Sequence, residues 1–335
     1  MLKKFMILAL FVGLLSARVI VDSHGEKVQI PDEITLASPL HHTSLQISLM
    51  LGNKDKIAFN SPLVMPTPLL ERVFPEIRLN PNISGLLANS VESIIASKPQ
   101  VAFGPKMSIF FDENAKKQLE AAGIAVVSIH KFLQNLEQIK GQVRIIAEIF
   151  GGQSIKKAQE WLEFTDNNVK FVSQRVAGIK NKKRVLHLNA RAGAYTAMGD
   201  NFVGAEFIRI AGGINVSTNL ISKVWNAVNE EQIIIFNPDI ILTNSSQSRE
   251  DILKNEVFKD LRAVKTGQIF IVPSGVFSWV PPNAEGTLRV VWLAKILYPE
   301  LFADLNLEAK VREFYAKFYD YDLSEDELEL ILNPK

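Results

Sequence analysis

Two segments of the chain carry nearly the same pattern of apolar and polar positions. Residues 91–104 read VESIIASKPQVAFG, and residues 230–243 read EEQIIIFNPDIILT. In each, apolar residues at helical spacing lead into a proline, and a short β-branched or aromatic run follows. Proline cannot continue a helix and favours extended geometry in the residue before it, so each segment predicts a helix, a break and a buried strand. One such unit in each half of the chain predicts two similar lobes.

The rest of the first half alternates between strand and helix patterns. Alternating apolar residues on either side of a Ser-His-Gly turn predict a hairpin over 18–31. We also expect strands at 34–39, 56–61, 100–104 and 125–130, and helices at 45–52, 90–97, 112–123 and 136–151. Strands that alternate with helices of this length predict a parallel sheet that is covered on both faces.

A long helical segment follows. No Pro or Gly occurs from Ser154 to Val176, and apolar residues recur there at helical spacing, which predicts one helix of about 35 Å. Beyond it we expect a second α/β region with strands at 184–190 and 268–273, the second repeated unit at 229–243, helices at 202–213, 248–255 and 284–297, and a charged helical brace at the C-terminal end.

The predicted fold class is therefore α/β, with two Rossmann-like lobes that contain parallel sheets and are joined by one long α-helix. The expected divisions are a signal peptide at 1–17, an N-terminal lobe at 18–152, a linker helix at 153–178 and a C-terminal lobe with terminal helices at 179–335.

The N-terminus has the pattern of a targeting segment. Two lysines precede an apolar run from Phe5 to Leu15, and small residues end it at Ser16-Ala17. The run is too short to span a bilayer, so we expect a cleaved secretory signal and a mature, soluble monomer that begins near Arg18; an uncleaved anchor is the alternative. The chain has no Cys, so it has neither disulfides nor a site for a lipid anchor, and the expected location is the periplasm. The net charge of +1, without a basic run, argues against a nucleic-acid partner.

Four segments, in this order, give the chain a family resemblance. They are VESIIASKPQVAF, EEQIIIFNPDIIL, FKDLRAVKTGQIFIVPSG and AEGTLRVVWLAKILYPELF. Together with two lobes on one long helix, they resemble the class III periplasmic substrate-binding proteins of ABC importers over essentially the whole mature chain. Many members of that family carry a lipidated N-terminal Cys, which this chain lacks.

The resemblance implies binding and delivery, without catalysis. The expected ligand is a metal chelate, such as a ferric siderophore, held between the lobes and passed to an inner-membrane permease dimer. Iron is the first expectation for the bound metal, with nickel or cobalt as alternatives, and no intrinsic cofactor is expected. A binding protein for an oxyanion such as molybdate, or for haem or cobalamin, is the alternative. A periplasmic cofactor-handling enzyme of related outline is a further alternative, although the chain lacks a nucleophile elbow, a phosphate loop and a His-Glu-x-x-His motif.

Candidate ligand residues follow the strands, because ligands of open parallel sheets collect beyond the carboxyl ends of the strands. His41 and His42 follow the first core strand, and imidazole binds transition metals or donates to an anionic chelate. Adjacent side chains diverge, so we expect one of the two to contact ligand and the other to cap the next helix or to lie exposed. His24 is expected in solvent, and His187 in the core.

The other candidates occupy the equivalent positions after later strands. A guanidinium holds carboxylates or oxyanions, a phenol coordinates ferric iron, and aromatic rings stack on flat chelates. Packing roles are the alternative for the aromatic residues, and an ion pair is the alternative for the arginine. The candidates are Asn60, Lys106, Arg191, Tyr195, Phe277 and Trp279, and Arg191 and Tyr195 are expected together in the small-residue loop NARAGAYTAMG.

Glu92 and Glu231 occupy matching positions in the two repeated units. Each is expected in the first turn of a helix, where a carboxylate offsets the positive end of the helix dipole, with Asn89 or Ser90 and Asn229 as caps. The resemblance implies a further role, in which one exposed carboxylate from each lobe pairs with arginines of the permease dimer.

Overall fold

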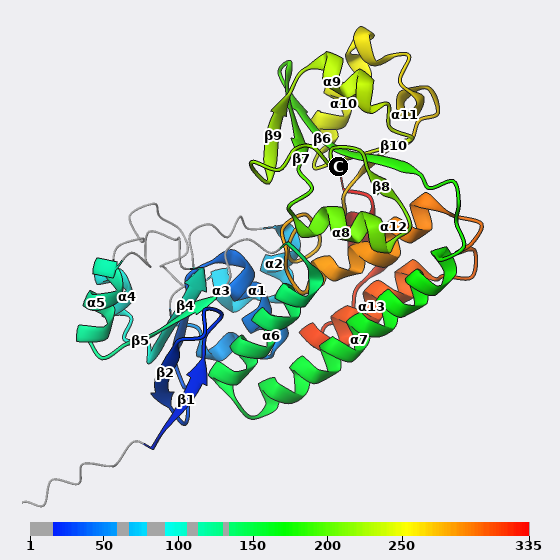
Figure 1. Cartoon of the computed structure of the whole chain (residues 1–335). Coiled ribbons are helices and arrows are strands. Elements are labelled where there is room, and N and C mark those ends of the chain that lie inside the picture. The colour runs from blue at the N-terminus through cyan, green and yellow to red at the C-terminus, as the bar shows by residue number, and fades with distance from the viewer. Residues whose placement is uncertain (1–15, 59–66, 79–90, 106–112, 130–133, 335) are drawn as a thin grey trace, which may run out of the picture.

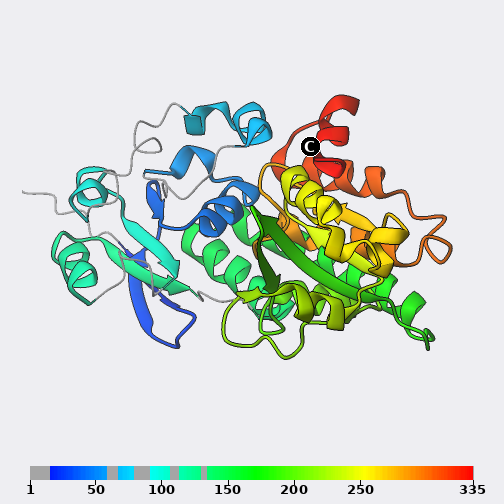
Figure 2. The same cartoon turned by 90° about the horizontal axis from the view of Figure 1, so that it is seen from above.

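The computed structural model describes residues 16–58, 67–78, 91–105, 113–129 and 134–334. Two α/β regions lie towards the two ends of a long helix, α7 (Gln153–Val176), which runs along one side of the molecule (Figure 1). We call the part before α7 the N-terminal lobe and the part after it the C-terminal lobe. The two lobes remain distinct when the molecule is seen from above (Figure 2). The expected two-lobed α/β fold is confirmed, while the exact domain boundaries stay a prediction.

The N-terminal lobe contains a hairpin and a parallel sheet. The hairpin pairs β1 (Ala17–Val21) with β2 (Lys27–Pro31), as expected. The sheet has the order β3-β4-β5, with all pairs parallel, and its strands are β3 (Ala37–Pro39), β4 (Val101–Pro105) and β5 (Ala125–Ile129). The strand expected at 56–61 is limited, within the described residues, to one bridge between Ala37 and Ile57.

The described helices of this lobe are α1 (His42–Met50), α2 (Pro68–Val73), α3 (Pro75–Arg78), α4 (Val91–Ala96), α5 (Glu113–Ala121) and α6 (Leu136–Phe150), with a 3-10 turn at Lys54–Lys56. Of these helices, α1 and α5 pack directly on the sheet. Asn135 caps α6 by accepting a hydrogen bond from the Gln138 N–H, and Gly151, at φ +68°, ends it. The 24-residue α7 starts two residues later and buries Trp161 and Phe164 on its inner face.

The C-terminal lobe contains a mixed sheet where we expected a parallel one. Its parallel part comprises β6 (Arg184–Arg191), β8 (Ile214–Asn215), β10 (Ile240–Thr243) and β11 (Ile269–Ile271). The second half of β6 pairs antiparallel with β7 (Ala194–Met198), which pairs antiparallel with β9 (Trp225–Val228). The segment NARAGAYTAMG, which we interpreted as a loop, is thus a hairpin whose turn uses left-handed Ala192 and Gly193.

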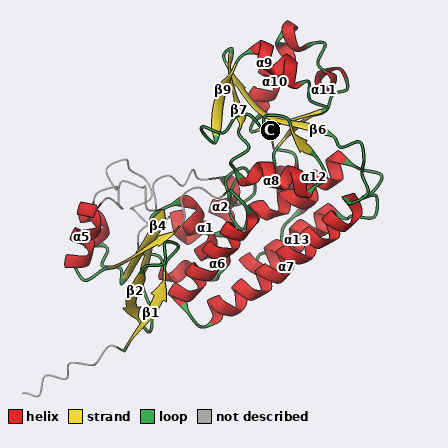
Figure 3. Ribbon diagram, viewed as in Figure 1, coloured by secondary structure: helices red, strands yellow, loops and turns green. Residues whose placement is uncertain are grey.

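The helices of this lobe pack on both the sheet and the N-terminal lobe. They are α8 (Val203–Ile210), α9 (Glu230–Phe236), α10 (Ser246–Lys254), α11 (Arg262–Lys265), α12 (Arg289–Leu297), α13 (Leu307–Tyr319) and α14 (Glu325–Leu332), with 3-10 turns at Glu256–Phe258 and Glu285–Leu288. Figure 3 shows α12 and α13 running along α7. Because α13 contacts both α1 and α12, the C-terminal brace joins the two lobes.

The repeated units form as predicted except at one residue in each. The helices α4 and α9 lead through Lys98-Pro99 and Asn237-Pro238 into the buried strands β4 and β10. We expected extended backbone before each proline, but Lys98 has φ +50° and Asn237 has φ +34°. The Asn237 N–H bonds to the carbonyls of the last helical turn, so closure of the helix end decides the conformation of this residue.

Candidate functional site

The first core strand delivers two histidines to the carboxyl edge of the N-terminal sheet. β3 ends at Pro39, and α1 begins at His42. His41 is the N-cap of α1, and its Nδ1 accepts a hydrogen bond from the Thr43 N–H (3.3 Å) and lies 2.8 Å from Thr43 Oγ1. One histidine of the pair therefore caps the helix, which is one of the two roles that we expected.

His42 is the histidine that is left to contact a ligand. Its ring is half-buried, its centroid lies 4.0 Å from that of His41, and its Nδ1 has no hydrogen-bond partner within the described residues. Burial lowers the pKa of His42 to about 4, so the imidazole is neutral at physiological pH. A neutral ring with an unused nitrogen can coordinate a metal or bond to a polar ligand.

Two of the expected ligand residues, Asn60 and Lys106, lie outside the described residues. Arg191 is exposed at the tip of the β6–β7 hairpin. Tyr195 is buried in β7, where its hydroxyl accepts a hydrogen bond from Asn255 Nδ2 (2.6 Å) and its ring packs edge-on against Phe258. These contacts favour the packing alternative for Tyr195, and its role and that of Arg191 in ligand binding stay predictions.

Trp279 and Phe277 are also buried, in the segment that follows β11. Both donate to Glu285, Trp279 from Nε1 to Oε1 (3.0 Å) and Phe277 from its backbone N–H to Oε2 (3.2 Å). Neither ring is available for stacking in this conformation, because Trp279 is 0% exposed and Phe277 only 7%. Their placement favours a core role, and stacking on a ligand remains untested.

Glu285 is the centre of a buried hydrogen-bond network where the two lobes meet. The hydroxyls of Tyr315 (2.8 Å) and Tyr319 (3.1 Å) in α13 also donate to its carboxylate. Gln46 in α1 donates to the Tyr319 hydroxyl (2.7 Å) and accepts from the Ala284 N–H (2.9 Å). Burial raises the pKa of Glu285 to about 7, although its four donors act in the opposite direction. The network fixes how α1 sits against the C-terminal lobe.

A second polar cluster lies between β6 and α12, in which His187 and Arg289 are buried and Asn244 is exposed. His187 in β6 donates from Nε2 to Asn244 Oδ1 (2.7 Å), and its Nδ1 accepts from Nη2 of Arg289 (3.0 Å). Asn244 follows β10, so the cluster lies beside the carboxyl ends of the parallel strands. Burial and the adjacent guanidinium lower the pKa of His187 well below its ordinary value, and burial lowers the pKa of Arg289 to about 9. His187 is thus neutral and Arg289 cationic at physiological pH.

The expectation that His187 is a satisfied core residue is confirmed, but Arg289 was missed. A signal for it exists in the sequence. Arg289 is in line, at helical spacing, with Leu293 and Leu297, which are fully buried. A charged residue on the apolar stripe of a helix is unusual enough to mark a candidate site.

Glu92 and Glu231 are both exposed in first helical turns, of α4 and α9 respectively. Asn229 caps α9 through a capping box with Gln232, as expected for that lobe. The expected caps of α4, Asn89 and Ser90, lie outside the described residues. The helix-dipole role is therefore available to both carboxylates, and the docking role stays a prediction.

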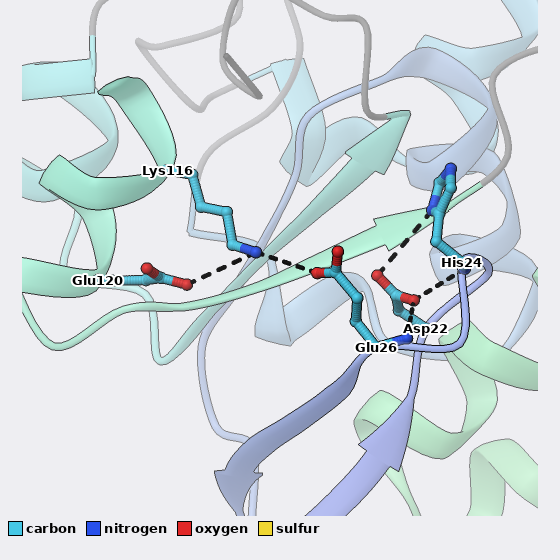
Figure 4. Close-up of polar contacts among 5 residues, drawn as sticks. All are labelled: Asp22, His24, Glu26, Lys116 and Glu120. Carbon is cyan, nitrogen blue, oxygen red and sulfur yellow. Dashed lines mark hydrogen bonds and ion pairs between the residues drawn. The ribbon is translucent and has the colours of Figure 1, made fainter. Parts of the chain in front are cut away.

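A further polar cluster lies at the β1–β2 turn (Figure 4). The Asp22 carboxylate accepts from the backbone of His24 (2.8 Å) and Glu26 (2.9 Å), which closes the turn, and His24 is exposed as expected. Lys116 of α5 pairs with Glu26 (3.1 Å) and lies 4.0 Å from Glu120. These contacts tie α5 to the hairpin and give the cluster a structural role.

Across the part of the chain that the structure describes, no three His, Cys, Asp or Glu side chains converge in a way that could hold a metal ion. Within the same residues, no helix is long and apolar enough to cross a membrane. Among the buried polar groups that lack a hydrogen-bond partner within the described residues are His42, beside the N-terminal sheet, and Arg289, in the C-terminal lobe.

Comparison with known proteins agrees with this architecture. Residues 39–276 match the family described as "Periplasmic binding protein", and the chain belongs to that family. The molybdate-binding protein MolA of Haemophilus influenzae is 27% identical over 91% of this chain and 92% of its own length. The haem uptake protein IsdE of Staphylococcus aureus is 27% identical over 66% of this chain and 75% of its own length. The crystal structure of a periplasmic solute-binding protein from Veillonella parvula superposes with a TM-score of 0.80, covers 95% of this chain and 97% of that one, and has 24% sequence identity.

Proposed function

We propose that this chain is the substrate-binding component of an ABC importer, that it acts in the periplasm, and that it delivers a metal-containing ligand to an inner-membrane permease. The observation that carries the proposal is the family match over residues 39–276, which includes parts of both lobes. Two sheets whose carboxyl edges serve one site are suited to enclosing a small molecule.

The ligand class is proposed from the relatives and from the polar groups at the sheet edges. MolA is named for molybdate and IsdE for haem, so metal oxyanions and metal chelates are both represented among proteins similar to this one. His42 supplies a neutral imidazole, and Arg289 supplies a buried cation. We therefore propose a metal oxyanion or an anionic metal chelate as the ligand.

Delivery to a permease is tested by replacing the two matched carboxylates. Glu92 and Glu231 are exposed, so Glu→Lys at either position should barely change the melting temperature or ligand affinity. Uptake of the ligand by cells should fall sharply in the Glu92→Lys/Glu231→Lys double variant, because like charges would meet across the permease interface. Glu250→Lys on α10 is a matched control that also reverses an exposed carboxylate of the C-terminal lobe and should transport normally. Normal uptake in the double variant would leave only helix-dipole stabilisation for the two residues.

A further inference from the structure

Arg289 is a buried cation that has no anionic partner within the part of the chain that the structure describes. Its side chain is 0% exposed, and its Nε and Nη1 have no hydrogen-bond partner among the described residues. None of the ion pairs within the described part of the chain involves it. Buried charges are normally paired, because an isolated charge loses its hydration without replacement. An unpaired guanidinium therefore calls for a functional explanation.

Within the described residues, a single hydrogen bond holds the Arg289 guanidinium in place. His187 Nδ1 accepts from Nη2, and Asn244 fixes the His187 tautomer by accepting from Nε2. A neutral imidazole orients the guanidinium but contributes no negative charge. The N–H groups of Nε and Nη1 remain as unused donors on two edges of the planar guanidinium, and each can donate to a carboxylate or an oxyanion.

The start of α8 lies beside the same guanidinium. Gly204 is in the first turn of α8, and a Cβ added there would lie 3.1 Å from Arg289 Nη1 and 2.6 Å from Met198 Sδ. The N-cap, Phe202, provides no side-chain acceptor to the first-turn amides. The positive end of a helix dipole thus meets a buried cation, and both favour an anion.

The nearby carboxylates do not supply that anion. Glu206, in the same helix as Gly204, accepts a hydrogen bond from the Leu136 N–H of α6. Glu285 precedes Arg289 by one helical turn, but its oxygens accept from Trp279, Phe277 and two tyrosines. Neither carboxylate forms an ion pair with Arg289, and Glu206 also has the cations Arg209 and Lys140 nearby, so the positive charge at Arg289 is left for a ligand.

We propose that Arg289 and the first turn of α8 form an anion subsite, which receives an oxyanion or a carboxylate of the transported ligand. The inference rests on the proposed function, because it names the chemistry of the same ligand. In this structure the Met198 thioether lies against the subsite. Methionine has three rotatable side-chain bonds, so Met198 can move aside as the anion enters.

The test compares Arg289→Met with Arg262→Met in binding titrations of the purified chain. Arg262 is an exposed arginine of the same lobe that pairs with Asp239, so it is a matched control for loss of charge. The anionic probes are sodium molybdate, a free oxyanion, and ferric citrate and haem, which are carboxylate-bearing chelates. Nickel–histidine and cyanocobalamin, without net negative charge, complete the panel. The melting temperature of each variant is measured without ligand.

We expect at least one anionic probe to bind the unaltered chain in a 1:1 ratio. The same probe should bind Arg289→Met more than tenfold more weakly, and its affinity for Arg262→Met should be within twofold of its affinity for the unaltered chain. The probe that binds distinguishes a free oxyanion from a chelate. The melting temperature of Arg289→Met should equal or exceed that of the unaltered chain, because an apolar side chain replaces an uncompensated charge. A purely structural arginine would give the reverse, with a lower melting temperature and unchanged affinity.

The other outcomes separate the subsite from the proposed function. Equal affinity of Arg289→Met for a bound anionic probe would overturn the subsite and leave the proposed function intact. Binding of the uncharged probes alone would overturn the subsite and the proposed anionic ligand, and would leave the role in ABC import intact. Failure of the unaltered chain to bind any of the five probes would overturn the proposed function. If Arg289→Met does not fold, Arg289→Lys decides, because it keeps a charge but loses the fork; it should bind the same anionic probe at least tenfold more weakly.

Discussion

Glu285→Gln should change how the stability of the protein depends on pH. The carboxylate is 0% exposed and accepts four hydrogen bonds, and its pKa is raised from 4.5 to about 7. A carboxyl group whose pKa is higher in the folded state than in the unfolded state stabilises the fold when it is protonated. This contribution to stability is present in full below pH 4.5 and is lost as pH rises through about 7. The variant cannot ionise at this position, so its stability should lack this dependence on pH.

The magnitude follows from the shift of the Glu285 pKa. One pKa unit corresponds to about 1.4 kcal/mol, so the shift to about 7 is worth about 3 kcal/mol in full, most of which falls between pH 5 and pH 8. Gln also presents an amide N–H₂ to groups that donate to the carboxylate, which costs about 1 kcal/mol at every pH. Glu285→Gln should therefore be less stable than the unaltered protein at pH 5, and should approach or exceed its stability at pH 8.

Urea unfolding followed by far-UV circular dichroism, at pH 5, 6, 7 and 8, measures this difference in stability. Glu327→Gln is the control, because the pKa of Glu327 is lowered and this carboxyl is ionised in both states throughout that pH range. The stability difference for Glu327→Gln should stay constant from pH 5 to pH 8. A difference for Glu285→Gln that is equally constant would refute the reasoning, since it would mean that Glu285 stays ionised despite its burial.

Two further predictions concern the lobe junction and the histidine pair. Gly275→Ala should lower the melting temperature and weaken ligand binding, because a Cβ at this position would overlap the Glu285 carboxylate and the Tyr315 hydroxyl. A thermal melt in which the variant is as stable as the original protein would contradict this prediction. Replacing both His41 and His42 by Ala should weaken ligand binding more than tenfold, which corresponds to over about 1.4 kcal/mol. The loss of stability should be modest, because only a helix cap is removed. Unchanged affinity in a titration would show that the histidines do not belong to the site.

Much of the fold could be predicted because its signals are local. The long helix α7 begins and ends within two residues of the predicted stretch from Ser154 to Val176, because an uninterrupted amphipathic pattern and its flanking glycines are read directly from the sequence. The two repeated units likewise predicted the strands with which they end, β4 and β10. Proline marked the break in each unit but not its conformation, since the left-handed turns at Lys98 and Asn237 depend on how the helix end closes.

The β6–β7 hairpin was not predicted, because small residues such as those in 189–199 give no strong strand pattern. β7 is held by β6 on one side and β9 on the other, and β9 starts at Trp225, far along the chain. Pairing with distant strands therefore decides its conformation, which local propensity cannot show. Arg191 and Tyr195, which we expected in one loop, therefore lie in the hairpin, with Arg191 at its tip and Tyr195 in β7.

The candidate site was predicted in part for the same reason. His41 and His42 were located by their position after a strand, which is a local feature. Arg289 belongs to a helix, and its importance comes from what surrounds it: neutral His187 on one side, the start of α8 on the other, and no ion pair with a carboxylate among the described residues. These are tertiary relations between distant segments, so the sequence could mark Arg289 as unusual but could not show its neighbours.

The most direct test of the central proposal is native mass spectrometry of the protein purified from the periplasm of its own cells. We expect a single added mass that corresponds to one small anionic ligand per chain, released unchanged on denaturation. A chain that carries no ligand and that binds neither metal oxyanions nor metal chelates when these are added, or one that converts the ligand into a product, would contradict the proposal.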